Sequence, residues 1–159
     1  MLLSWPFPME SAHPLVVHFP IALLSAAVLI DLLALALRRP ALHRIALWNL
    51  CLGAVGAGLA VWTGLRAAEV ARHSFEIHQV MELHEKLGIA TLILGILVVV
   101  LRLSSRDRLG AAGRVLALVW MLMMACTLTY GAHLGGRLVY EFGVGGRFGV
   151  SPVELPPAR

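Results

Sequence analysis

The stretch HPLVVHFPIALLSAAVLIDLLALAL, residues 13–37, decides the fold of this chain. Between Leu15 and Leu37 the only ionisable side chains are those of His18 and Asp31. An apolar run of this length crosses a lipid bilayer as one helix of about 20 or more residues. Polar groups inside such a run are costly unless they have partners, so we take His18 and Asp31 as candidate functional residues.

The composition extends the membrane assignment to the whole chain. Hydrophobic residues make up 59% and charged residues 14% of the sequence, and the mean hydropathy is +0.83. These values fit an integral membrane protein without a separate soluble core. We predict an all-α fold, an integral membrane four-helix bundle forming a single domain over 1–159. Transmembrane helices are expected near 15–37, 46–65, 87–103 and 114–134, followed by an irregular tail over 135–159 that begins with a break at Gly135 and Gly136.

The arginines predict the orientation in the membrane. They gather in the loop after the first predicted span and in the loop after the third, which favours a cytoplasmic position for both loops. The N- and C-termini are then expected on the outer side of a multi-pass protein of the cell inner membrane. No clustered basic surface remains for nucleic acid, so the lipid bilayer is the expected partner and nucleic acid is not.

The histidines are distributed unequally in this topology. His43 is expected in an inner loop, and six fall on the outer side: His13, His18, His73, His78, His84 and His133. Their convergence indicates a cofactor or metal site at the outer face, with histidines that cap helix ends as the alternative. Asp31 is expected to form an ion pair with Arg38, Arg44 or Arg102, and a proton-transfer role is its alternative.

Helical spacing narrows the choice among these histidines. His84 shares a face with Gly88, Thr91 and Gly95, small residues that suit a porphyrin edge or close helix packing. His13 and His18 are five residues apart and point in different directions on a regular helix. A proline cannot donate a backbone hydrogen bond, so Pro20 is expected to kink the helix and could turn His18 inward.

The segment 72–86 is expected to extend the third helix outward. Its face carrying His78, Glu82 and Glu85 could bind a divalent transition metal, because imidazole and carboxylate are both metal ligands. The alternative is a solvated surface on which Glu82 pairs with Lys86 four residues later.

Four features resemble a known family. They are HPxxxHFPI at 13–21, the buried Asp31, His84-Glu85, and GGxLVYxxGVG at 135–145. The family they resemble consists of bacterial four-helix membrane proteins with a domain of unknown function, similar to the two-haem membrane b-type cytochromes. Some members of that family are fused to c-type cytochrome domains, so the resemblance implies a redox function at the outer face. Family members often carry a histidine where this chain has Phe142, and no helix here is expected to carry an inner-side histidine, so at most an outer haem site is expected.

These observations lead to three hypotheses. The first is a b-type haem-binding electron-transfer protein with haem b held near the outer face, by His18 and His84 first and His133 in reserve, with His13 and Arg137 as further candidates. The second is a non-haem metal-binding protein or metalloenzyme that uses His18, His78, His84 and Glu85. The third is a cofactor-free accessory subunit of a larger membrane redox complex. The first and third imply other membrane or periplasmic redox subunits as partners, and the sequence leaves open whether the chain is an enzyme.

Overall fold

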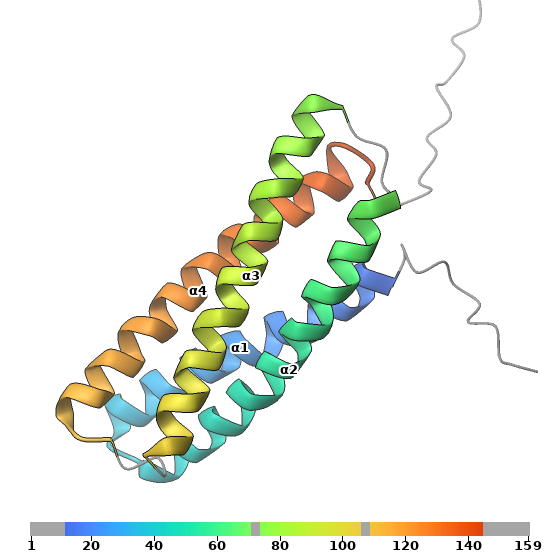
Figure 1. Cartoon of the computed structure of the whole chain (residues 1–159). Helices are drawn as coiled ribbons and strands as arrows, with labels where there is room; N and C mark the ends of the chain where they lie inside the picture. The colour runs from blue at the N-terminus through green and yellow to red at the C-terminus, as the bar shows by residue number, and fades with distance from the viewer. Residues whose placement is uncertain (1–11, 71–73, 106–108, 145–159) are drawn as a thin grey trace, which may run out of the picture.

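The computed structural model describes residues 12–70, 74–105 and 109–144, and these residues form four helices and no strand. Helix α1 spans Ala12–Leu37, α2 Pro40–Val70, α3 Phe75–Ser104 and α4 Ala111–Tyr140. Each is long and apolar enough to cross a membrane. Figure 1 shows them side by side in an elongated bundle, with α1 and α3 antiparallel to α2 and α4. The prediction of an all-α fold with four membrane-spanning helices is confirmed.

The helices extend beyond the predicted spans. Helix α3 begins at Phe75, which confirms the outward extension for its described part, since 71–73 lie outside the described residues. The predicted break at Gly135 and Gly136 is wrong, because α4 continues through both glycines to Tyr140. The chain leaves the helix only near Gly143, whose φ of +67° suits a residue without a side chain. Residues 145–159 of the predicted tail lie outside the described residues.

A two-residue connection joins α1 to α2. Arg38 adopts a left-handed conformation with φ of +52°, and the amide of Arg39 donates to the carbonyl of Ala34. This pattern is a helix C-terminal motif in which glycine normally takes the left-handed position. Pro40 then starts α2, where its missing N–H costs nothing and its fixed φ suits the first helical position.

The interior of the bundle is packed with side chains from all four helices. Its fully buried large side chains are Leu24, Leu50, Met121, Met124 and Val98. Lipid tails are as apolar as leucine, so helices in a membrane associate through close packing around small residues. Large apolar side chains cover the outside of every helix, as in Leu29, Val55, Ile93 and Val119, which suits contact with lipid.

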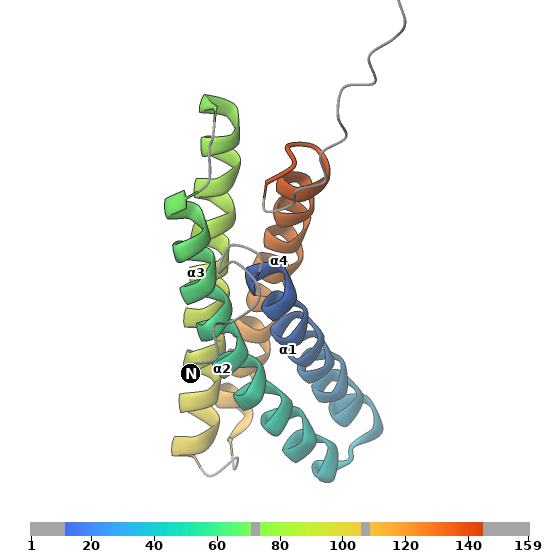
Figure 2. The same cartoon turned by 90° about the vertical axis from the view of Figure 1, so that its right-hand side faces the viewer.

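The two ends of the bundle differ in their polar residues. We call the end at which α1 begins the histidine end, because His13 and His84 lie there, and the opposite end the arginine end, after Arg102. Figures 1 and 2 both show the α3–α4 hairpin projecting beyond the start of α1 at the histidine end. The longer α3 therefore places His84, ten residues into its helix, level with His13 at the start of α1.

Candidate functional site

His13 and His84 meet at the histidine end. Their ring centroids lie 6.2 Å apart and the ring planes are inclined by 81°. His13 comes from the first turn of α1 and His84 from the third turn of α3, so two helices far apart in sequence supply the pair. Both residues are half-buried.

In both histidines the ring nitrogen Nδ1 forms a hydrogen bond. Nδ1 of His84 lies 2.8 Å from the carbonyl oxygen of Gly131, which can only accept, so this nitrogen carries a proton. Nδ1 of His13 lies 3.1 Å from Oγ1 of Thr63. Because the Thr63 hydroxyl hydrogen already bonds the carbonyls of Leu59 and Ala60, Oγ1 accepts from His13 as well.

The two rings therefore share one tautomer. With Nδ1 protonated, a neutral imidazole keeps its lone pair on Nε2, the usual position for binding a metal. The hydrogen bonds described above are both formed by Nδ1. The hydrogen bond at Nδ1 is the contact that orients a metal-bound histidine and raises its basicity.

A glycine on the neighbouring helix lies against each ring. A Cβ atom on Gly64 of α2 would lie 2.9 Å from Cε1 of His13, and one on Gly135 of α4 would lie 3.0 Å from Cε1 of His84. Both distances are shorter than the usual contact between carbon atoms, about 3.5 Å. The two glycines thus let the rings lie directly on the backbone of the adjacent helix.

His18 does not join this pair. Its side chain is exposed on α1, and its Nδ1 lies 2.6 Å from the carbonyl oxygen of Pro14 in the same helix. The expectation that Pro20 turns His18 inward is wrong: Pro20 is buried within a continuous α1, while His18 stays on the outside. Among the predicted ligands, the structure brings His13 to His84 and leaves His18 apart.

His133 and Arg137 lie on the exposed side of α4. His133 stacks on Tyr130, with ring centroids 6.3 Å apart and planes inclined by 17°. Nε of Arg137 donates to Glu141 at 2.8 Å, and its guanidinium carbon lies 5.9 Å from the ring centre of Phe142. Both side chains line a shallow surface cavity of about 290 Å³, whose lining does not include His13 or His84.

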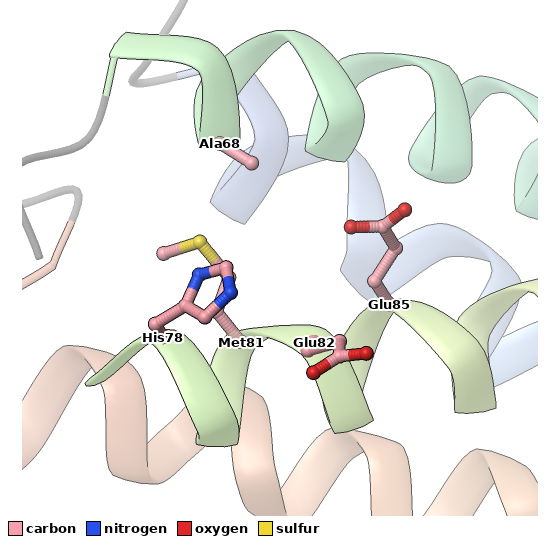
Figure 3. A pocket seen from close by; sticks show the side chains of 5 residues that line it. All are labelled: Ala68, His78, Met81, Glu82 and Glu85. Atoms are coloured by element: carbon pink, nitrogen blue, oxygen red, sulfur yellow. The ribbon is translucent and has the colours of Figure 1, made fainter. Parts of the chain in front are cut away.

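The predicted metal face forms a second shallow cavity, between α2 and α3. Figure 3 shows its lining of Ala68 from α2 and His78, Met81, Glu82 and Glu85 from α3, around a volume of about 160 Å³. Nζ of Lys86 donates to Glu82 at 2.6 Å, which confirms that pair. Over residues 12–70, 74–105 and 109–144, no group of three or more histidine, cysteine, aspartate or glutamate side chains is placed to hold a metal ion.

A polar cluster occupies the arginine end. Arg102 of α3 donates to Asp31 of α1 at 3.0 Å and to the backbone carbonyl of His43 at 2.6 Å, which confirms the ion pair expected for Asp31. His43 completes the cluster, with Nδ1 2.8 Å from Asp31. The expectation that no helix carries a histidine at this end is wrong, because α2 begins at Pro40 and includes His43. Pro40 was the available signal, since proline favours the first position of a helix.

Comparison with known proteins places the chain in a family. Residues 10–147 match the model of the family described as predicted membrane protein, DUF2231, and the chain belongs to that family. No curated protein and no solved structure matches the chain.

Proposed function

We propose that this member of the DUF2231 family is a b-type haem-binding electron-transfer protein of the membrane, with haem b held between His13 and His84. The observation that carries the proposal is the pair itself: two imidazoles from different helices lie side by side, each held by a hydrogen bond at Nδ1. His13 thereby replaces His18 as the partner of His84.

The two rings lie close enough to hold one ligand together. Their centroids are 6.2 Å apart, and an imidazole nitrogen binds a metal at about 2.0–2.1 Å. His13 and His84 would therefore be the residues that hold the haem iron.

The surroundings of the pair fit the same group. Gly64 and Gly135 let each ring lie directly on the backbone of the neighbouring helix. Thr63 and the carbonyl of Gly131 hold the imidazoles in the tautomer that binds iron. Bound haem would supply a one-electron iron couple, and the apolar bundle would shield it from water. On this proposal, other membrane or periplasmic redox subunits are the electron donor and acceptor. Arg137 is the candidate contact for a haem propionate.

Absorption spectroscopy with matched histidine variants tests the proposal. The full chain, expressed with added haem and purified in mild detergent, is expected to show a Soret band and sharpened α and β bands on reduction with dithionite. His13→Ala and His84→Ala should each abolish the low-spin spectrum. His18→Ala is the matched control, because His18 lies on the same helix as His13 and is exposed, and it should leave the spectrum unchanged.

Three outcomes would overturn the haem assignment. One is a protein that stays colourless although haem is supplied, and another is a haem spectrum that survives the loss of both His13 and His84. The third comes from elemental analysis. A stoichiometric transition metal that is present without haem, and is lost in both His13→Ala and His84→Ala, would show that the pair binds a single metal ion instead of haem.

A further inference from the structure

We infer that the chain is a tandem duplication of one helical hairpin, whose copies are offset by 71 residues and related by a pseudo-twofold axis along the bundle. The hairpins are α1–α2 and α3–α4. Pro40 begins α2 and Ala111 begins α4, two starting points separated by this offset. His13 and His84 are separated by it too, as are Gly64 and Gly135.

The contacts within the two hairpins repeat at this offset. His13 packs on Gly64 in the first hairpin, and His84 packs on Gly135 in the second. Pro20 lies against Gly56 in the first hairpin. The equivalent positions in the second hairpin are Thr91 and Thr127, and the hydroxyl of Thr91 donates to that of Thr127 at 2.8 Å.

In one repeated contact the large and the small residue have changed places between the two hairpins. In the first hairpin Leu24 fills the space of Gly53, where a Cβ would lie 2.6 Å from Leu24 Cδ2. The equivalent positions hold Gly95 and Met124, and a Cβ on Gly95 would lie 3.5 Å from Met124 Sδ. The glycine thus stands on the second helix in one copy and on the first helix in the other, so the contact is kept although neither residue is.

The pattern of burial follows the same offset. All four buried residues of α3 stand at positions equivalent to buried residues of α1, as the series Thr91, Gly95, Val98, Arg102 and Pro20, Leu24, Ala27, Asp31 show. Ala46, Leu50, Ala60 and Thr63 of α2 are buried, and so are their equivalents Ala117, Met121, Gly131 and Leu134 of α4. The same face of each hairpin therefore points into the bundle.

Two contacts place the axis. In a twofold arrangement, a residue that touches its own equivalent lies on the axis. His13 touches His84 at one end, and Asp31 touches Arg102 at the other. Because α1 and α3 run in the same direction, the axis lies along the bundle, as in membrane proteins built from parallel repeats. The symmetry is approximate, because α2 packs on α3 more extensively than α1 packs on α4.

The duplication explains why the two halves of the histidine site match. Each copy supplies one imidazole, one glycine beneath it and one oxygen that accepts from Nδ1. On the proposed function, on which this step rests, His13 and His84 would hold the haem as equivalent residues, with Gly64 and Gly135 as equivalent positioning residues. The duplication itself does not depend on a cofactor.

Packing exchange tests the duplication without reference to any ligand. Gly95→Leu combined with Met124→Gly rebuilds in the second hairpin the pair that Leu24 and Gly53 make in the first. Each single change should lower the midpoint of unfolding in detergent, one through a clash and the other through a cavity, and the double variant should regain most of the loss. A double variant no more stable than the worse single variant would overturn the inference.

Charge exchange tests the axis in the same way. Asp31→Arg combined with Arg102→Asp exchanges the two members of the pair. If the positions are equivalent, the new arginine finds the backbone carbonyl of Arg114 where Arg102 now finds that of His43. The double variant should remain monodisperse under conditions in which the single variants aggregate, and failure of this rescue would argue against the axis.

The equivalence of the two histidines toward haem is tested separately from the fold. In a haem-loaded protein, Gly64→Ala and Gly135→Ala should shift the reduced α band or the midpoint potential by similar amounts, and a shift in only one variant would contradict equivalent ligands. A colourless protein in which both exchanges rescue folding would remove the proposed function and keep the duplication.

Discussion

Replacing Arg102 by methionine probes how much the polar cluster at the arginine end stabilises the bundle. Arg102 is 2% exposed and Asp31 8%, so both charges are largely withdrawn from water. Removing one partner of a buried ion pair generally costs about 3–5 kcal/mol, because the other charge stays buried without its counterion. Methionine keeps most of the side-chain length, so the loss reflects the charge and the hydrogen bonds to Asp31 and to the His43 carbonyl rather than a large cavity.

The assay is equilibrium unfolding in mixed micelles, carried out as a double-mutant cycle with Asp31→Leu. We expect a loss of about 3–5 kcal/mol for Arg102→Met and recovery of most of it in the double variant, because an apolar pair no longer buries a lone charge. Glu82→Gln is the matched control, since its pair with Lys86 is exposed to solvent and its loss should leave the free energy of unfolding nearly unchanged. A loss below about 1 kcal/mol for Arg102→Met would refute the reasoning and rank the pair with surface contacts.

Three further changes test individual contacts. Gly135→Ala should destabilise the bundle by about 1–3 kcal/mol, since the new methyl group meets His84, whereas Gly58→Ala, with nothing within 4 Å, should be neutral or stabilising; equal unfolding midpoints would contradict this. Thr91→Val removes the 2.8 Å hydrogen bond to α4 and should cost about 0.6–1.7 kcal/mol in the same unfolding assay, a gain in stability being the contrary result. Arg38→Gly should raise the free energy of unfolding by about 0.5–1 kcal/mol by relieving a left-handed φ, and a loss would show that the arginine side chain matters more than the turn.

The sequence was sufficient for features that depend on one helix at a time. The apolar run around Asp31 predicted a spanning helix, because length and composition alone decide whether a segment can cross a bilayer. Burial in that run required a partner for Asp31, and Arg102 was one of only a few basic residues near the same depth. Both predictions are confirmed by the four spans and by the 3.0 Å contact.

The histidine pair depended on features that one helix does not reveal. His13 and His18 lie near the same end of α1, and which of them faces inward is set by the rotation of α1 against its neighbours. That rotation follows from Pro20 and Leu24, which pack on glycines of α2 and thereby leave His18 on the outside. Spacing within α1 places the two histidines on different faces, but only the contacts with α2 identify the inner face.

The repeat is hard to recognise in the sequence, because several equivalent positions carry residues of opposite charge or size. Asp31 and Arg102 are equivalent yet opposite in charge, and Leu24 and Gly95 are equivalent yet opposite in size. Substitutions of this kind remove sequence identity while preserving each contact, because a contact across the axis needs complementary partners rather than identical ones.

The two axial pairs stand where a bilayer can best accept them. Eighteen residues separate His13 from Asp31, and eighteen separate His84 from Arg102, which is about 27 Å of helix at 1.5 Å per residue. This length is close to the thickness of the hydrocarbon core, about 30 Å, so one polar pair lies near each boundary. The charges at the arginine end neutralise each other and are joined by a hydrogen bond. At the histidine end each imidazole is held at Nδ1, and this pair is the one that we propose as the place for a ligand.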